Sequence, residues 1–352
     1  MDIAKIDKNF KVETDIKRNG LSFYDVKIAP FALNGVFYEN GLYRRLPENT
    51  AKAISDGTIA LHANTAGGAV RFRSNSKRIA VSVKYRGIGR MGHFPLTGAA
   101  GLDIYYLYGN KWIYHKTFVP SFEVNDTLES EVFFADSAER ELLINFPTYS
   151  EVAELLIGLE DSADLSAPSD YTFDKPIVFY GSSITQGGCT SRPGNAYTAI
   201  AARLLDCPHI NLGFSGNAHG EKKMADYIAG LDMTAFVLDY DHNAPSSEHL
   251  RNTHESFFLT VREKHPLLPI VMMTRPKYHL NAADEEAERI KIITETYENA
   301  LKRGDKNVAL IKGYEMITEN IAEYALVDDC HPNDCGFTAM AFKLTEVLKN
   351  ML

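Results

Sequence analysis

The sequence predicts two domains of different class: an all-β sandwich or jelly roll, followed by an α/β domain with a five-stranded parallel sheet. Three observations indicate this arrangement. The chain of 352 residues is about twice the usual length of one domain. Short strand-like segments fill its first half, and strand-like and helix-like segments alternate in its second half. We therefore predict domains at 1–165 and 172–352.

The first domain is predicted from short segments that glycine and proline separate. Residues 78–85 (RIAVSVKY) alternate apolar and polar side chains, which is the period of a strand with one buried face. Further strands are expected at 102–119, where a Gly109-Asn110 turn would join two of them, and at 141–148 and 153–160. Helical periodicity is scarce apart from a stretch near 48–56. Such a pattern is typical of an antiparallel sandwich or jelly roll.

A polar segment at 161–170 has no periodicity and is expected to be a linker. After it, the continuous apolar run at 175–181 (KPIVFYG) indicates a strand buried on both faces of a parallel sheet. Further strands of this sheet are expected at 209–216, 235–241, 268–276 and 307–313. Helices are expected between and after them, near 195–206, 220–230, 246–264, 283–303 and 335–350. Right-handed crossovers then place helices on both faces of an open sheet.

Composition and charge exclude several classes of function. The net charge of −9, without a local cluster of basic residues, argues against a nucleic-acid partner. Residues 1–20 are charged and lack the apolar core of a secretory signal. No apolar run approaches the roughly 20 residues of a membrane span. We expect a cytoplasmic protein without a membrane partner, and leave homo-oligomer formation open.

The four cysteines show no spacing typical of a zinc site, and we expect reduced structural thiols and no metal. They are Cys189, Cys207, Cys330 and Cys335.

A candidate nucleophile follows the first buried strand of the second domain. In residues 181–187 (GSSITQG), Ser183 would lie where a strand turns into a helix, so that backbone N–H groups face a developing oxyanion. A serine at this place is also a common helix N-cap, and the segment alone does not decide between the two interpretations.

A candidate base precedes the last helix. A serine hydroxyl needs a base, and the base needs an orienting carboxylate. His331 follows Asp328 by three residues, so that one short loop would deliver both groups. Asp329 competes as the partner of His331, and Asp241 is a further alternative. The loop could also be no more than an acidic N-cap region with a surface histidine.

Two other loops carry candidate oxyanion donors. Gly216 follows the second strand and Asn243 follows the third, so that a glycine N–H and an asparagine amide could join the N–H of Ser183. Because carboxyl ends of parallel strands share one edge of the sheet, we expect all four loops to converge there.

The order Ser, Gly, Asn and Asp-x-x-His resembles the SGNH (GDSL-like) hydrolases. The resemblance implies a flavodoxin-like catalytic domain with Ser183 as nucleophile, His331 as base and Asp328 as its partner. It also implies Gly216 and Asn243 as oxyanion donors with the Ser183 N–H. The chain departs from the family pattern in two places. The usual Gly-Asp-Ser reads Gly-Ser-Ser at 181–183, and the usual Gly-x-Asn-Asp reads Asp-His-Asn-Ala at 241–244.

Longer stretches resemble two-domain bacterial SGNH esterases, whose N-terminal β-domain carries a Gly-x-Asp-Leu-Tyr-like signature. That signature corresponds here to 101–105 (GLDIY). Other similar stretches are 42–47 (LYRRLP), 64–73 (NTAGGAVRFR), 181–197 (GSSITQGGCTSRPGNAY) and 237–245 (VLDYDHNAP).

The resemblance implies a serine esterase that removes small acyl groups, acetyl above all, from sugars or oligosaccharides through an acyl-enzyme and without a cofactor. Arg192 and His242 are candidate substrate contacts, and each also has an ordinary structural interpretation. Tyrosines of residues 102–119 could likewise be a sugar platform or plain core. The alternative function is an inactive carbohydrate-binding protein on the same scaffold. No phosphate-binding glycine motif follows a strand, which excludes a nucleotide-binding protein.

Overall fold

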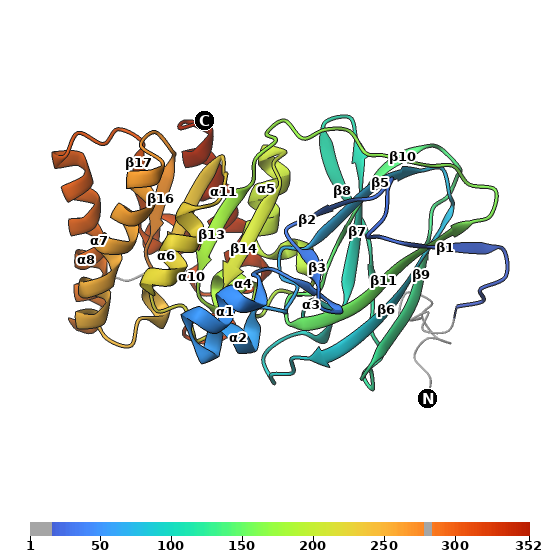
Figure 1. Cartoon of the computed structure of the whole chain (residues 1–352), viewed down its shortest axis with the longest axis horizontal. Helices are drawn as coiled ribbons and strands as arrows, with labels where there is room; N and C mark the ends of the chain where they lie inside the picture. Colours follow the sequence, from blue (N-terminus) through green and yellow to red (C-terminus); the bar gives the residue numbers. More distant parts are fainter. Residues whose placement is uncertain (1–15, 278–283) are drawn as a thin grey trace. The chain divides into compact units, whose positions relative to one another are not determined.

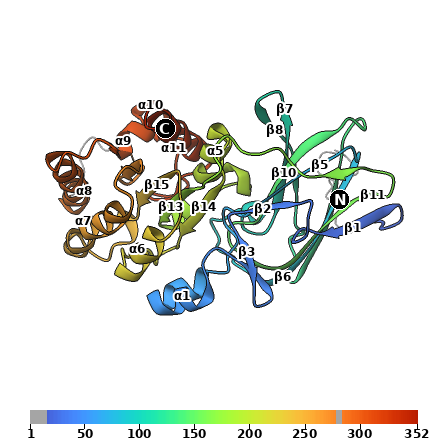
Figure 2. The ribbon, with the colours of Figure 1, turned by 45° about the horizontal axis from the view of Figure 1, so that its top comes forward.

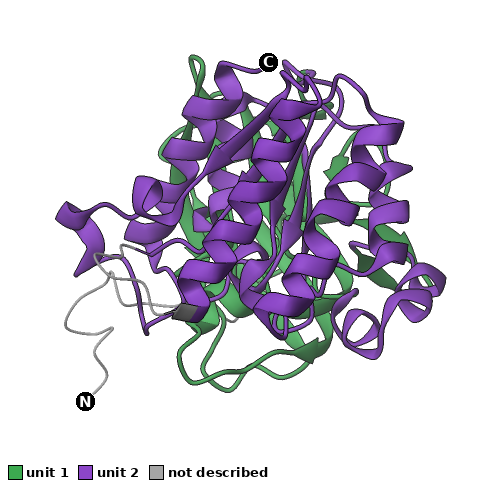
Figure 3. Ribbon diagram, turned by 90° about the vertical axis from the view of Figure 1, so that its left-hand side faces the viewer, with its two compact units in different colours: residues 1–44, 63–169, 191–194 green, residues 45–62, 170–190, 195–352 purple. Residues whose placement is uncertain are grey.

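The computed structural model describes residues 16–277 and 284–352, and these form two compact units (Figure 1, Figure 3). The first unit contains the chain up to Arg44, then Ala63–Ser169 and Ser191–Gly194. The second contains Arg45–His62, Asp170–Thr190 and Asn195–Leu352. Two short segments therefore group differently from the rest of their half of the sequence, namely 45–62 and 191–194.

The first unit contains two antiparallel sheets. One has the order β1 (Leu21–Asp25), β11 (Ser150–Glu160), β6 (Arg78–Ile88) and β9 (Thr127–Phe133). The other has the order β12 (Leu165–Ser166), β5 (Ala69–Ser74), β10 (Arg140–Asn145), β7 (Leu102–Tyr108) and β8 (Lys111–Phe118), with β2 (Ala32–Asn34) also paired to β5. A separate hairpin joins β3 (Phe37–Glu39) and β4 (Leu42–Arg44), and α3 (Leu96–Ala99) precedes β7.

One apolar core holds this sandwich together. Ile79, Val81 and Val83 of β6 are buried in it, as their alternation predicts. The opposite side of β6 is not simply exposed, because Ala80 packs with Ile16 and Leu21 in a smaller apolar cluster. The predicted turn at Gly109 joins β7 to β8, with Gly109 at φ +57°.

The expected linker at 161–170 is largely part of the sandwich, and that prediction was wrong. Within it, β12 pairs with β5, and the Ser74 hydroxyl donates to the Asp164 carbonyl at 2.7 Å. Ser169 donates through its backbone N–H to Glu141 at 3.1 Å. A polar composition without periodicity does not reveal such contacts, because they join residues far apart in the sequence.

The second unit is an open parallel sheet with the order β14, β13, β15, β16 and β17. Its strands are β13 (Ile177–Gly181), β14 (His209–Gly213), β15 (Ala235–Asp239), β16 (Ile270–Met273) and β17 (Val308–Ile311). Its helices include α4 (Ser183–Gln186), α5 (Tyr197–Leu205), α6 (Lys222–Ala229), α7 (Ser247–Lys264), α8 (Asp284–Lys302), α9 (Gly313–Met316), α10 (Glu319–Ala322) and α11 (Asp334–Lys349). Residue 283, the predicted start of α8, lies outside the described residues.

Helices cover both faces of this sheet (Figure 2). Val178 and Tyr180 of β13 are buried in a core that includes residues of α6, α7 and α8. The alternate residues Ile177 and Phe179 are buried with residues of α5 and α11 on the other face. β13 is therefore apolar on both sides, which explains the continuous apolar run at 175–181. The predicted fold class is confirmed.

Residues 45–62 carry two short helices, α1 (Glu48–Ile54) and α2 (Asp56–Leu61). They group with the second unit because Leu46 and Ala51 are fully buried in the core beside α6. The buried Arg45 guanidinium adds polar contacts, since it donates to the carbonyls of Asn211 and Gly213 at 2.9 and 2.7 Å.

All four cysteines are free thiols. Across the described part of the chain, none of the helices is both long and apolar enough to cross a bilayer. The interpretation of residues 1–20 as lacking a secretory signal concerns a segment of which 1–15 lie outside the described residues.

Candidate active site

Ser182 and Ser183, at the turn from β13 into α4, have different partners. Ser182 is the N-cap, and its hydroxyl accepts the Ile184 N–H at 3.1 Å. Ser183 is the first helical residue, and its hydroxyl lies 2.9 Å from His331 Nε2. Glycine is required before them, because a Cβ on Gly181 would lie 2.0 Å from the Thr185 hydroxyl and 2.2 Å from the Asp239 carbonyl oxygen. The cap and the candidate nucleophile are thus separate serines.

The imidazole of His331 lies between Ser183 and Asp328. Its Nε2 is 2.9 Å from the Ser183 Oγ, and its Nδ1 is 2.9 Å from the Asp328 Oδ2. A histidine that donates through Nδ1 to a carboxylate presents an unprotonated Nε2, which accepts a proton from the serine hydroxyl. The structure therefore brings together the three residues that the sequence suggested.

The loop that carries Asp328 and His331 is closed by its own backbone. The Val327 N–H donates to the His331 carbonyl at 2.8 Å. Asp328 Oδ1 accepts the N–H groups of Cys330 and His331 at 2.7 and 2.6 Å. Partial burial acts to raise the pKa of Asp328, but these donors and the imidazole outweigh it and lower the pKa to about 2. The carboxylate is therefore ionised at neutral pH and fixed in orientation.

The two alternative partners of His331 lie elsewhere. Asp329 is 82% exposed at its side chain and pairs with the Lys277 ammonium at 2.6 Å. Asp241 is buried and accepts the Arg275 N–H at 3.0 Å. The i−3 spacing and the family resemblance both favoured Asp328, and Asp328 is the carboxylate hydrogen-bonded to His331 Nδ1.

The candidate oxyanion donors follow the strands on either side of β13. Gly216 comes after β14 at φ +69°, and no acceptor among the described residues contacts its N–H. Asn243 ends a short 3₁₀ helix, Asp241–Asn243, after β15, and its N–H donates to the Tyr240 carbonyl at 3.0 Å. Within the described chain its side-chain oxygen is buried without a hydrogen-bond partner. Of the two, only the Gly216 N–H is a donor shown without an acceptor among the described residues, and the unpaired atom of Asn243 is an acceptor.

A buried carboxyl group is hydrogen-bonded to the nucleophile turn, and the sequence analysis missed it. Asp239, the last residue of β15, accepts hydrogen bonds from Thr185 Oγ1 at 3.0 Å and Tyr197 OH at 2.8 Å. Burial, with the nearby Asp241 charge, raises the pKa of Asp239 to about 8. Its position at a strand end resembles that of the other candidates, but nothing in the sequence indicated its partners.

His242, a candidate substrate contact, lines a pocket of about 220 Å³ with Asp241, Arg275, Arg289 and Ile290, together with Glu285 and Glu286. Burial, reinforced by the charge of Arg275, lowers the pKa of His242 to about 3, so the imidazole is neutral. The Cys330 Sγ lies 3.9 Å from both of its ring nitrogens. A substrate group bound beside Asn243 would meet a neutral ring here.

Arg192, the other candidate substrate contact, is held by side chains of the first unit. Its Nη1 donates to Asp103 Oδ2 at 3.0 Å and also contacts the Tyr105 hydroxyl. Its guanidinium carbon lies 3.8 Å from the centre of the Tyr114 ring. These contacts give Arg192 a structural role, and a role toward substrate stays a prediction.

Within the described residues of the second unit, one group of possible metal ligands lies in the loop that carries Asp328 and His331. Donor atoms of Asp328, Cys330 and His331 lie within 4.8 Å of one another. Two of these residues are hydrogen-bonded to each other, and burial raises the pKa of the Cys330 thiol, which disfavours the thiolate that metals bind. The group fits a hydrogen-bonded acid–base pair better than a metal centre.

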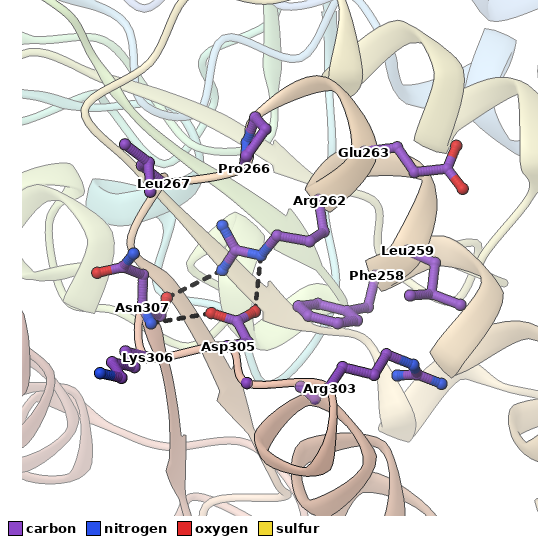
Figure 4. A pocket seen from close by; sticks show the side chains of 12 residues that line it. Phe258, Leu259, Arg262, Glu263, Pro266, Leu267, Arg303, Asp305, Lys306 and Asn307 are labelled. Atoms are coloured by element: carbon purple, nitrogen blue, oxygen red, sulfur yellow. Dashed lines mark hydrogen bonds and ion pairs between the residues drawn. The ribbon is translucent and has the colours of Figure 1, made fainter.

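A larger pocket lies away from all the candidate residues (Figure 4). Its volume is about 520 Å³, and it is lined by the end of α7 and by the segments that precede β16 and β17. The Arg262–Asp305 ion pair, at 2.7 Å, lies in its wall. Because this pocket is at the amino ends of the strands, it is opposite the edge where the candidate residues gather.

Comparisons with known proteins agree with the two-unit fold. Residues 174–349 match the GDSL-like lipase/acylhydrolase family, and residues 21–165 match the GxDLY domain, described as the N-terminus of SGNH-hydrolase-type esterases. No curated protein matches the chain.

Solved structures resemble both halves of the chain. One described as a GDSL-like lipase from Bacteroides ovatus has 28% identity and a TM-score of 0.83, over 94% of this chain and 98% of that one. A salicylyl-acyltransferase from a tetracycline biosynthetic pathway has 21% identity and a TM-score of 0.77, over 95% and 98%. A family two carbohydrate esterase from Clostridium thermocellum has 16% identity and a TM-score of 0.62, over 91% and 98%. The last two show the shared fold alone. The chain belongs to the GDSL-like lipase/acylhydrolase family, with an N-terminal GxDLY domain.

Proposed function

We propose that this protein is a serine esterase that hydrolyses small acyl esters, acetyl esters of sugars or oligosaccharides in particular, through Ser183, His331 and Asp328. The observation that carries the proposal is the continuous hydrogen-bond chain from the Ser183 hydroxyl through the imidazole to the Asp328 carboxylate. Family membership supports ester hydrolysis as the reaction. The proposal requires no metal or organic cofactor.

The reaction proceeds in two acyl transfers. His331 Nε2 takes the proton of Ser183 as the Oγ attacks the ester carbonyl carbon, and the tetrahedral intermediate collapses when the imidazolium returns that proton to the leaving alcohol. His331 then deprotonates a water molecule that attacks the acyl-enzyme. The carboxylic acid leaves, and Ser183 regains its proton. Asp328 holds the imidazole in the required tautomer throughout.

The tetrahedral oxyanion is proposed to bind the N–H groups of Ser183 and Gly216 and the side-chain amide of Asn243. Loss of one such donor lowers kcat by about 100- to 1,000-fold in serine hydrolases. We therefore expect Asn243→Ala to lower kcat by about 100-fold with little change in KM, because the amide meets charge only in the transition state. Steady-state kinetics on p-nitrophenyl acetate measure this. A fall in kcat of less than about threefold would remove Asn243 from the oxyanion site.

Two observations support a preference for acetylated sugars. Carbohydrate esterases occur among the structures that share this fold, including an acetyl xylan esterase from Butyrivibrio proteoclasticus. The pocket beside His242 is lined mainly by polar and charged side chains, which suits a substrate with hydroxyl groups.

Acetate release from acetylated xylo-oligosaccharides, manno-oligosaccharides and monosaccharides tests this preference. It should be compared with hydrolysis of p-nitrophenyl esters of acyl chains from two to twelve carbons, with Ser183→Ala as the blank. We expect at least about tenfold higher kcat/KM for acetyl than for octanoyl esters, and acetate release from at least one sugar class. Preference for long chains, with no release from any sugar, would contradict the sugar-ester proposal and leave an esterase of another specificity.

The alternative of an inactive carbohydrate-binding protein is disfavoured by one observation. Ser183, His331 and Asp328 are all present and hydrogen-bonded in the order that catalysis requires. A scaffold without activity would gain nothing from this alignment. An inactive protein would show no difference between the wild type and Ser183→Ala in the same acetate assay.

A further inference from the structure

The aspartate of the Gly-x-Asp-Leu-Tyr-like motif has no exposed surface and is fully engaged. Asp103 lies on β7 in the first unit. Its Oδ1 accepts the Asn145 side-chain N–H at 2.8 Å. Its Oδ2 accepts Arg192 Nη1 at 3.0 Å and the Gly194 N–H at 2.9 Å. A buried carboxylate is tolerated only with such donors, and two of the three come from one short segment of chain.

That segment, residues 191–194, is here called the loop tip, and it groups with the first unit. Besides Asp103, the Thr97 hydroxyl binds it by donating to the Ser191 carbonyl at 2.6 Å. The packing at Gly194 is close, because a Cβ there would lie 2.4 Å from the Tyr105 hydroxyl and 2.7 Å from Asp103 Oδ2. The motif residues Asp103 and Tyr105 therefore form a seat that fits this segment and requires glycine in it.

The loop tip is continuous in sequence with the nucleophile turn. Directly after α4, the N–H groups of Gly187 and Gly188 donate to the Ser183 carbonyl at 3.1 and 2.8 Å. Cys189, next along the chain, is buried with φ +69°, a conformation that a non-glycine residue keeps only where its surroundings impose it. The path from Ser183 to the loop tip is thus short and constrained.

The residues that flank the loop tip are hydrogen-bonded to α11, the helix that follows the loop of Asp328 and His331. Asp334, the first residue of α11, accepts Thr190 Oγ1 at 3.4 Å and Asn195 Nδ2 at 2.8 Å. Asp334 is three residues after His331. Asp334, close in sequence to His331, therefore holds the residues on either side of the loop tip, and Asp103 holds the loop tip itself.

We propose that Asp103 is a positioning residue for ester hydrolysis: by binding the loop tip it fixes segment 187–195 and, through it, the nucleophile turn. This inference rests on the proposed function of Ser183. It assigns a positioning role to the aspartate and tyrosine of the motif, and it includes Arg192 among the residues that hold the loop tip. A displacement of about 1 Å at a reacting group can cost about 100-fold in rate, so a distant anchor can control turnover.

The test compares Asp103→Asn with Glu141→Gln, a matched control. Glu141 is also a buried carboxylate of the same sheet, and it pairs with Arg71 rather than with the loop tip. We expect Asp103→Asn to lower kcat for p-nitrophenyl acetate at least about tenfold, with KM within about threefold of the wild type. Glu141→Gln should lower the melting temperature while its kcat stays within about twofold of the wild type.

Conservative replacement of the arginine separates positioning from folding. Arg192→Lys keeps a cation for Asp103 and for the Tyr114 ring, whereas Arg192→Met keeps only the length of the side chain. We expect Arg192→Lys to retain at least about threefold more of the kcat than Arg192→Met, at equal melting temperatures within about 3 °C. Equal kcat for the two variants would contradict the proposal.

If Asp103→Asn fails to fold, the Thr97→Val and Arg192→Met variants test the positioning proposal instead. Thr97→Val removes only the hydroxyl that holds Ser191, so we expect a folded protein with a kcat about two- to fivefold lower. Wild-type kcat in both Thr97→Val and Arg192→Met, or in folded Asp103→Asn, would overturn the inference. Activity retained by Ser183→Ala would instead overturn the proposed function, so the two failures are distinguishable.

Discussion

Replacement of Ser183 by alanine is expected to lower hydrolysis of p-nitrophenyl acetate by at least about 1,000-fold, since loss of the nucleophile in serine hydrolases costs about this much or more in kcat. The fold should persist, because the N-cap hydrogen bond of α4, to the Ile184 N–H, comes from Ser182 and remains in this variant. Stopped assays with purified protein, together with circular dichroism, measure both quantities.

Ser182→Ala is the matched control for this experiment. It removes a hydroxyl one residue away, but that hydroxyl serves as the N-cap of α4. We expect a loss of about 1 kcal/mol in the free energy of unfolding, with kcat within about tenfold of the wild type. If Ser183→Ala kept more than about a tenth of the wild-type rate, Ser183 would not be the nucleophile.

Asp328→Asn is expected to lower kcat by about 1,000-fold or more, whereas Asp329→Asn should change kcat less than about twofold. Asp328 accepts from His331 Nδ1 at 2.9 Å and sets the tautomer, and an amide in its place can present an N–H to that nitrogen instead. Asp329 is exposed and pairs with Lys277. Parallel kinetics of the two variants give the answer, and the reverse ranking would reassign the carboxylate.

The Asp328→Asn variant also has a signature in the pH dependence of stability. Hydrogen bonds lower the pKa of Asp328 to about 2, below its ordinary value near 3.9. A lowered pKa stabilises the fold above the ordinary value, and this contribution is lost as the pH falls from about 4 through about 2. Asp328→Asn should therefore flatten the fall of the melting temperature in this range relative to the wild type.

Several features of the protein followed from the sequence because they depend on local pattern. The five strand-then-helix units predicted an open parallel sheet, and the period-two alternation at 78–85 predicted β6 of the sandwich. Parallel strands place their carboxyl ends at one edge, so the loops of Ser183, Gly216 and Asn243 were expected together. The structure has these loops after the adjacent strands β13, β14 and β15.

The short helices near 48–56 were expected, but their grouping with the second unit was not. Hydropathy shows that Leu46 and Ala51 belong in a core, but it does not show which core. In the same way, residues 161–170 are polar in sequence, yet they contribute β12 and the Ser169–Glu141 contact. Pairing of distant segments is not encoded in the composition of either one.

The sequence by itself determined the two fold classes, the strand-end position of Ser183 and the presence of an Asp-x-x-His loop. Only the tertiary structure decided that Ser182 caps the helix while Ser183 meets the histidine, and it has the expected Asp328 hydrogen-bonded to that histidine. It also gave Arg192 its partner in Asp103. The physical reason is that periodicity records burial, which each residue carries locally. A hydrogen bond depends on distance and direction between groups that the fold must first bring together.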